Sequence, residues 1–366
     1  MQKNKKYNQF LIAGFFTLLT GFAMLSVLLP DKELSKTERR HYAAMPELSF
    51  ETVADKSFMS DLETYLLDHF AGREFFRVLK TETETGLLGK TDANQYVRQD
   101  GYLYELDLNW KKSNVTRTAK RLAQFAKEQL AGAKVYYAVI PDKSHYLPKD
   151  KYTVEEDAWV LTQLKEQLVG AEYIDLYPYL SIEDYYKTDL HWRQEEITDV
   201  AQILLETMGT SDIEPDFRKE TVLAEFYGGY AGASAYRVKA EPMYAFNSSA
   251  IENAIVYDYE LQQETGVYAP EKLDGMDPYD YYLGGARALL SIHNPEKENG
   301  KKLLLFRASF GSSLAPLLLE GYEEIMLVDL RYVSMEYFTK LIDVSSYDDV
   351  LFLYSQRVLR HSDSFK

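Results

Sequence analysis

The first hydrophobic feature of the chain is an uncharged apolar run over residues 10–29. At about 1.5 Å per residue, a helix of this length is just able to cross the roughly 30 Å hydrocarbon core of a bilayer. Residues 1–9 carry three lysines and no acid, so we expect a cytoplasmic tail, and no A-x-A-like cleavage site follows the run. The pattern favours an uncleaved transmembrane signal anchor, and a cleaved signal peptide, the alternative, would leave the same exported domain.

Residues 30–50 mix both charge signs with two prolines and suit a solvated stalk. Beyond them, apolar positions alternate between helical and strand periods. Helical spacing around residues 58–66 continues towards residue 76, and strand-like runs at 135–141 and 171–177 flank a helix at 158–170. A strand, helix, strand, helix, strand series follows over residues 301–355.

This alternation predicts an extracytoplasmic α/β domain over residues 51–366, built on a mostly parallel, doubly wound sheet. The block at about 211–285 is less regular and is punctuated by Pro and Gly. We expect it to form an excursion beside the sheet.

Composition narrows the function classes. A formal net charge of -16 argues against a nucleic-acid partner. The chain contains no cysteine, which removes disulfides and thiolate chemistry, and its 6 histidines are scattered without ligand spacing. We therefore expect no metal site and no cofactor.

Catalytic chemistry is suggested by the segment Thr-Asp-Leu-His-Trp at residues 188–192. Residues two apart in an extended segment point the same way, so the Asp189 carboxylate can hold Nδ1–H of His191 and leave Nε2 free to accept a proton. The structural alternative is that Asp189 caps a helix beginning near Trp192 while His191 packs against its neighbours.

A nucleophile for such a pair belongs where a strand ends and a helix begins, because free backbone N–H groups there stabilise an oxyanion. The run at 303–306, the turn Arg-Ala-Ser-Phe-Gly and a helix from about Ser312 have this form, with Ser309 in the turn. The alternative reading is that Ser309, Ser312 and Ser313 are ordinary N-cap hydroxyls, and we expect at least one of them to cap the helix.

These motifs together resemble the DHHW family and the related alginate O-acetylation proteins, within the wider SGNH hydrolase-like group. The likeness covers nearly the whole exported region, from the opening segment at residues 37–49 through the Tyr-Gly turn at 225–234 and the Gly pair at 277–286 to the serine turn. It implies a three-layer α/β sandwich with a Ser–His–Asp triad that moves acetyl groups onto or off cell-surface polysaccharide. It also implies a membrane-bound O-acyltransferase partner that supplies the acyl group, and a location on the outer side of the bacterial cell membrane.

Carried over residue by residue, the resemblance makes Ser309 the nucleophile, His191 the general base and Asp189 its orienting carboxylate. Four further residues are expected near the substrate or the oxyanion: Arg307, Gly285, Tyr227 and Trp192.

Two positions depart from the family pattern, which usually has Asp before the serine and Asn after the Gly pair. This chain has Ala308 and Ala286 instead. If that Asn donates to the oxyanion, its loss costs on the order of a hundred- to a thousandfold in rate. The sequence therefore predicts an O-acyltransferase or esterase, and the alternative is a catalytically degenerate relative that binds glycan or scaffolds a surface-polymer assembly.

Overall fold

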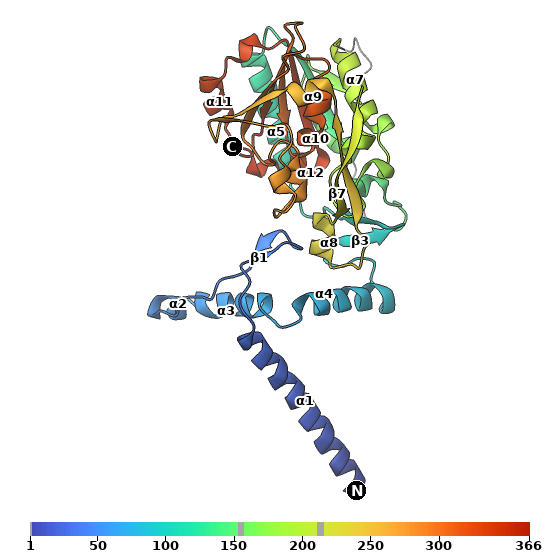
Figure 1. Ribbon diagram of the computed structural model, residues 1–366, viewed down its shortest axis with the longest axis vertical. Coiled ribbons are helices and arrows are strands. Elements are labelled where there is room, and N and C mark those ends of the chain that lie inside the picture. The colour runs from blue at the N-terminus through green and yellow to red at the C-terminus, as the bar shows by residue number, and fades with distance from the viewer. Residues whose placement is uncertain (1, 153–156, 211–215) are drawn as a thin grey trace. The chain divides into compact units, whose positions relative to one another are not determined.

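The computed structural model describes residues 2–152, 157–210 and 216–366 (Figure 1). The chain divides into two compact units. The first comprises Met1–Ala93 and Ala231–Arg237, and the second comprises Asn94–Tyr230 and Val238–Lys366. The sequence expectation began the folded domain at residue 51, whereas this division groups residues 51–93 with the amino-terminal unit.

The first unit is mainly helical. Its elements are α1 (Gln2–Leu28), β1 (Leu34–Ser35), β2 (Arg40–His41), α2 (Phe50–Ala54), α3 (Ser57–Asp68), α4 (Arg73–Glu82) and the π-helix η1 (Thr83–Leu87). Residues 6–28 of α1 are long and apolar enough to cross a membrane, judged by length and composition. The pair β1–β2 makes residues 34–41, part of the expected stalk, a short hairpin.

The second unit is built on one eight-stranded sheet with the order β10-β9-β11-β13-β12-β14-β5-β6. Pairing is parallel from β13 through β12, β14 and β5 to β6, and antiparallel from β13 through β11 and β9 to β10. The strands are β5 (Lys134–Ile140), β6 (Glu172–Ile174), β9 (Ile255–Asp258), β10 (Gln263–Thr265), β11 (Leu289–His293), β12 (Lys302–Arg307), β13 (Glu324–Val328) and β14 (Asp349–Ser355). The predicted mostly parallel sheet is confirmed.

Helices cover both faces of this sheet. One face packs against α7 (Thr198–Met208), α9 (Ser249–Asn253) and α10 (Phe310–Leu318). The other packs against α5 (Lys112–Gln129), α6 (Asp157–Gln167), α11 (Met335–Leu341) and α12 (Gln356–Arg360). Alternate residues of each central strand enter the two cores, as Leu305 and Phe306 of β12 do, which explains why these strands read as continuous apolar runs.

The irregular block divides between two structures. β7 (Arg218–Phe226) pairs with β8 (Glu241–Asn247) as a separate two-stranded sheet, as an excursion requires, but β9 and β10 extend the main sheet at its antiparallel edge. Residues 211–215 of the block lie outside the described residues. A further hairpin joins β3 (Tyr96–Gln99) to β4 (Tyr102–Glu105), and α8 (Gly229–Ser234) follows β7.

Short 3-10 helices occupy several connections of the second unit. They are η2 (Lys143–Tyr146), η3 (Tyr177–Tyr179), η4 (Ile182–Asp184), η5 (Gln194–Glu196), η6 (Pro270–Lys272), η7 (Pro278–Tyr281), η8 (Val344–Ser346) and η9 (Ser362–Ser364). Four of them, η2, η4, η5 and η7, lie beside the segment that carries Asp189 and His191.

Candidate active site

Ser309 lies at the carboxyl end of the parallel strands, two residues after β12 ends and one before α10 begins. Its hydroxyl makes no capping hydrogen bond to α10. Ser309 therefore occupies the N-cap position of α10, as expected of one of the three serines, but without the expected hydroxyl cap. The apolar run of β12 and the helix after it place this side chain at the sheet edge where ligands of α/β proteins bind.

The Ser309 hydroxyl instead joins a chain of hydrogen bonds with His191 and Asp189. The distance from Nε2 of His191 to Oγ of Ser309 is 2.7 Å, and that from Nδ1 of His191 to Oδ1 of Asp189 is 2.6 Å. Oδ1 of Asp189 also accepts the backbone N–H of His191 at 3.1 Å, so the carboxylate fixes both the imidazole and its backbone. Asp189 and His191 are buried, whereas Ser309 is partly exposed.

The helix-capping alternative for Asp189 does not describe this structure. No helix begins at Trp192: η5 starts at Gln194, and its N-cap residue, Arg193, makes no side-chain capping bond. Tyr185 instead forms a β-bridge with Trp192, and the N–H of Tyr186 donates to the carbonyl of His191. Residues 186–191 thus form a tight loop, which we call the Asp-His loop.

Lys143, the first residue of η2, binds the carbonyl groups of the Asp-His loop. Its ammonium group donates to the carbonyls of Tyr186, Lys187 and Asp189 at 2.7, 3.1 and 2.9 Å. Burial lowers the pKa of Lys143 to about 7. Sequence reasoning missed this residue, because nothing in a Pro-Asp-Lys turn indicates a contact with a loop more than forty residues later.

Glu241, the first residue of β8, binds the hydrogen-bond donors of the same loop. Its carboxylate accepts the N–H groups of Lys187 and Thr188 at 3.0 Å each, and the Thr188 hydroxyl also at 3.0 Å. Loop carbonyls and loop N–H groups are therefore both satisfied by charged side chains, which makes these hydrogen bonds stronger than neutral ones.

The Tyr-Gly turn after β7 completes the support. The N–H of Gly229 donates to Oδ2 of Asp189 at 2.7 Å, and the N–H of Gly228 donates to Oγ1 of Thr188 at 2.9 Å. A Cβ on Gly228 would lie 2.3 Å from the carbonyl oxygen of Thr188. Only glycine allows the two backbones to approach this closely. The glycine at residue 228 therefore lets the turn lie against the loop and bond the Asp189 carboxylate.

Aromatic residues fix the imidazole plane. The ring of Tyr279 in η7 stacks on that of His191, with centroids 3.8 Å apart and planes 6° from parallel. The Tyr279 hydroxyl and the indole N–H of Trp192 both bond Oγ of Ser313 in α10, at 2.7 and 2.8 Å. Trp192 is thus a buried link between the Asp-His loop and α10. Tyr279, like Lys143 and Glu241, is a residue that the sequence did not indicate.

Arg307 is fully buried at the end of β12. Its Nη1 donates to Oγ of Ser312 at 3.1 Å and lies 3.9 Å from Asp329, while its Nε and Nη2 have no hydrogen-bond partner among the residues that the structure describes. Desolvation lowers the pKa of Arg307, although the Asp329 carboxylate opposes this effect. The structure therefore places its guanidinium inside the protein, against the first turn of α10.

The remaining positions singled out from the sequence differ in their surroundings. Tyr227 is half exposed at the end of β7. Gly285 is buried with a φ of 85°, and a Cβ there would lie 2.1 Å from Oδ1 of Asp280, which explains the glycine at this turn. Ala286 is exposed, and Ala308 packs into the core on the α5–α6 side of the sheet.

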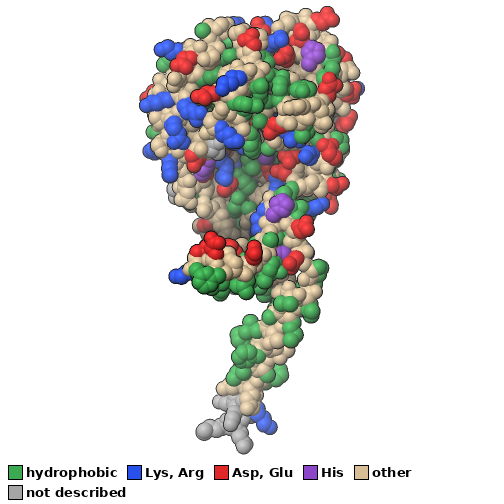
Figure 2. Space-filling view, turned by 90° about the vertical axis from the view of Figure 1, so that its left-hand side faces the viewer, with side chains coloured by type: hydrophobic (Ala, Val, Ile, Leu, Met, Phe, Trp, Pro, Cys, Tyr) green, Lys and Arg blue, Asp and Glu red, His purple; other side chains and the backbone are tan. Residues whose placement is uncertain are grey.

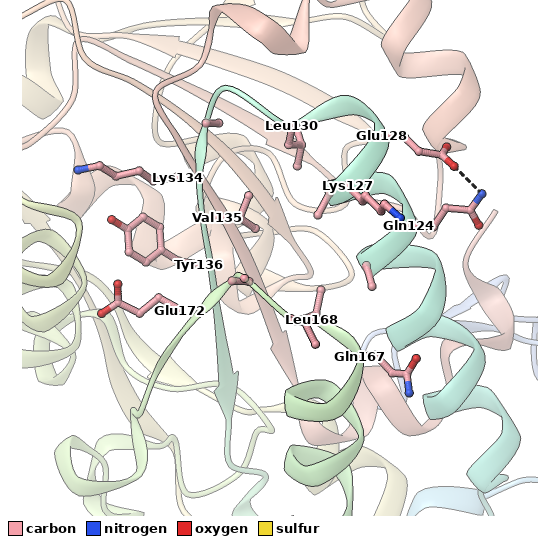
Figure 3. Close-up of a pocket in the computed structure, with 16 residues that line it drawn as sticks. Gln124, Lys127, Glu128, Leu130, Lys134, Val135, Tyr136, Gln167, Leu168 and Glu172 are labelled. Atoms are coloured by element: carbon pink, nitrogen blue, oxygen red, sulfur yellow. Dashed lines mark hydrogen bonds between the residues drawn. The ribbon is translucent and has the colours of Figure 1, made fainter.

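A cavity of about 850 Å³ lies at the opposite end of the strands. It is lined by residues of α5, by the first residues of β5 and by the turn into β6, including Lys127, Tyr136 and Glu172 (Figure 3). Neither Ser309 nor His191 lines it. Among the described residues, no group of three or more His, Cys, Asp or Glu side chains is arranged to hold a metal ion.

Comparison with known proteins agrees with this fold and these motifs. Residues 168–328, which include the Asp-x-His-Trp segment, match the model of the DHHW protein family, so the resemblance to this family is confirmed. No curated protein sequence matches the chain significantly.

Solved structures share the fold. A DHHW family protein from Eubacterium siraeum superposes with a TM-score of 0.62 at 20% identity, over 74% of this chain and 92% of that one. PatB1 of Bacillus cereus gives 0.57 at 19%, over 74% and 98%. The O-acetyltransferase domain of AlgJ from Pseudomonas putida gives 0.44 at 11%, over 74% and 93%. The first two similarities, taken with the eight-stranded sheet, confirm the SGNH-like α/β fold.

Proposed function

We propose that this protein is a membrane-anchored, extracytoplasmic O-acyltransferase or esterase, acting on acetyl groups of a cell-surface polysaccharide. The observation that carries the proposal is the unbroken chain of hydrogen bonds from Asp189 through His191 to Ser309. A helix-capping role for the serine does not require a hydrogen bond to an imidazole whose other nitrogen bonds a buried carboxylate, whereas activation of the serine as a nucleophile does.

In this mechanism Oγ of Ser309 attacks the carbonyl carbon of the acyl donor while Nε2 of His191 takes the hydroxyl proton. The tetrahedral intermediate collapses when His191 returns that proton to the leaving oxygen, and the acyl group stays on Ser309. A sugar hydroxyl then attacks the acyl-enzyme and gives its proton to His191, which passes it to Oγ of Ser309 as the second tetrahedral intermediate collapses to the sugar ester. Water in place of the sugar makes the reaction an ester hydrolysis.

The oxyanion needs donors, and the first turn of α10 supplies them in this proposal. The N–H groups at a helix start have no intrahelical carbonyl to bond, and they carry the positive end of the helix dipole. Those of Ser309 and Phe310 stand at that end, whereas Gly311 and Ser312 already donate to Ala308 and Ser309. These two amides take the place of an Asn side chain, which the chain lacks at Ala286.

Anchoring follows from α1, whose residues 6–28 serve as the transmembrane span with the second unit outside the cell. The polysaccharide substrate and a membrane-bound O-acyltransferase that delivers the acyl group come from the family resemblance. An anchored domain stays near such a partner and near polymer emerging at the membrane.

A serine-directed fluorophosphonate tests the chemistry. We expect it to label the full-length protein in detergent, and we expect Ser309→Ala to abolish this labelling, because the variant lacks the oxygen that attacks the phosphorus. Ser345→Ala, which changes an exposed serine of η8, is the matched control and keeps the wild-type rate.

Equal labelling of the wild type and Ser309→Ala would refute the triad. The alternative function, glycan binding without chemistry, rests on Ala286 and Ala308, which lack the polar side chains that the family pattern usually has at these positions. It predicts an unlabelled Ser309 in a folded protein that still binds polysaccharide.

A further inference from the structure

The helices α3 and α4 of the first unit bury polar residues and expose large apolar ones, the reverse of what is usual in a soluble protein. An amphipathic helix in water buries its apolar face and exposes its polar one. In α4 the buried residue is Thr81, which donates to the carbonyl of Ser234, while Phe75 is 65% exposed and Leu79 is 48% exposed. In α3 the buried residue is Asp68, and Leu66 is 51% exposed.

The polar face of α4 is covered by protein. Arg77 donates to the carbonyl of Gly232 at 2.7 Å and lies 3.3 Å from Glu38, and Arg73 forms a hydrogen-bonded ion pair with the same glutamate. On α3, the buried Asp68 carboxylate pairs with Arg40. The polar sides of α3 and α4 thus contact the rest of the unit, whereas Leu66, Phe75 and Leu79 on their apolar sides stay exposed.

The outward apolar surface extends beyond these two helices. α2, α3 and α4 form one layer across the carboxyl end of α1 (Figure 1). Viewed from the α2 end, hydrophobic side chains gather on the side of the layer towards the amino terminus of α1, and acidic side chains on the other side (Figure 2). The exposed apolar residues of this layer, which we call the apolar underside, are Phe50, Val53, Met59, Leu66, Leu67, Phe70, Phe75, Phe76, Leu79, Leu87 and Leu88.

The apolar underside is continuous with the surface of the proposed span. Phe22 of α1 contacts the rings of Phe70 and Phe76, with centroids 5.6 and 5.4 Å away, and the Ser26 hydroxyl accepts the N–H of Ala71 at 2.9 Å. Between α1 and α3 lies an apolar cavity of about 740 Å³, lined by residues of both helices. Water in such a space would contact almost only hydrocarbon, whereas lipid acyl chains fill it without that cost.

The depth of these contacts also fits a bilayer. Phe22 lies six residues before the end of α1 at Leu28, which corresponds to about 9 Å along the helix axis. Amphipathic helices that lie in a membrane interface bury their apolar faces by roughly 5–10 Å. The rings of Phe70 and Phe76 therefore meet α1 at the depth that an interfacial helix reaches.

We propose that residues 50–88 form an interfacial platform, whose apolar underside lies in the outer leaflet of the lipid bilayer that α1 crosses. The proposal rests on the anchoring role given to α1 in the proposed function. It commits to lipid as the partner, because the surface is apolar, adjoins the span and lies at the depth of the acyl-chain boundary. The platform would thus fix the first unit to the membrane along α2–α4 as well as through one helix.

The chain has no cysteine, so single cysteines can carry a nitroxide label in the full-length protein reconstituted into phosphatidylcholine vesicles. Two labels probe the underside, at Leu66→Cys and Leu79→Cys. Two matched labels probe the polar sides of the same helices, at Thr64→Cys and Glu74→Cys. A fifth, at Leu18→Cys, probes α1.

We expect collisions with dissolved oxygen to exceed those with a water-soluble nickel chelate at residues 66, 79 and 18. At residues 64 and 74 we expect the reverse, with a severalfold higher rate of collision with the chelate. If residues 66 and 79 meet the chelate as freely as residues 64 and 74 while residue 18 is protected, the platform is refuted and the anchor stands.

Protection of residues 66 and 79 from both reagents would overturn lipid in favour of a protein covering. Free access of the chelate to residue 18 would show that α1 does not span the bilayer, which removes the anchor of the proposed function and the platform together. Retention of the far-ultraviolet circular dichroism spectrum identifies the labelled variants that are folded.

Discussion

At the scale of single residues, the candidate site depends on charged groups that do no chemistry. Lys143 and Glu241 bond the carbonyls and the N–H groups of the Asp-His loop, and neither touches Ser309. A buried carbonyl or N–H left without a partner costs about 1–3 kcal/mol. These two side chains are therefore positioning residues, which act on the reaction through the placement of Asp189 and His191.

We predict that Lys143→Met lowers kcat about 100-fold with little change in KM, because a shift of the loop by about 1 Å misplaces the imidazole. The rate of fluorophosphonate labelling and the kinetics of an activated acetyl ester measure this effect. The matched control is Lys187→Met, which removes an exposed lysine from the same loop. Unchanged kcat in Lys143→Met would refute the positioning role.

The same variant has a predicted pH signature. Burial lowers the pKa of Lys143 from 10.5 to about 7. Between pH 7 and 10.5, Lys143 is therefore mostly deprotonated in the folded protein and mostly protonated in the unfolded chain. The free energy of unfolding therefore gains a contribution that rises with pH across this window and is absent below pH 7. Urea unfolding at several pH values should show the wild type gaining stability relative to Lys143→Met as pH rises. A constant difference would contradict the lowered pKa.

At the scale of elements, the Tyr-Gly turn and the Asp-His loop act as one unit, because Gly228 and Gly229 donate to Thr188 and Asp189. We predict that Gly228→Ala, whose Cβ would lie 2.3 Å from the Thr188 carbonyl oxygen, costs about 1–3 kcal/mol of stability and about 100-fold in rate.

Gly132→Ala is the matched control, because its Cβ would meet no atom within 4 Å. Thermal unfolding and probe labelling of the two variants decide the comparison. If Gly228→Ala labels as fast as Gly132→Ala, the close approach of the two backbones has no role in placing Asp189.

The elements that the sequence predicted are those whose environment is uniform along their length. β5, β12 and β14 are buried on both faces, so their apolar runs show them directly, and the strand-to-helix turn pointed to Ser309. β9 and β10 lie at the sheet edge, where short strands with exposed residues resemble loops. The contacts of Lys143, Glu241 and Tyr279 with the loop join distant parts of the chain, and no local pattern encodes them.

At the scale of the whole chain, the boundary between the two units illustrates the same limit. Helical spacing predicted α3 and α4 correctly, but a periodic apolar stripe does not say whether protein or lipid covers it. The exported domain was expected to begin at residue 51, directly after the expected stalk. In the structure polar residues of these helices contact the rest of the first unit, while Leu66, Phe75 and Leu79 stay exposed.

Membrane orientation is a property of the whole chain that single cysteines can also determine. We predict that Gln9→Cys reacts with a membrane-impermeant maleimide only after cell lysis, because the short basic end stays inside. Glu298→Cys, in the exposed connection between β11 and β12, should react in intact cells. The cysteine-free wild type is the control for background labelling. Reaction of residue 9 in intact cells would reverse the proposed orientation, whereas loss of that residue from the mature chain would show cleavage in place of an anchor.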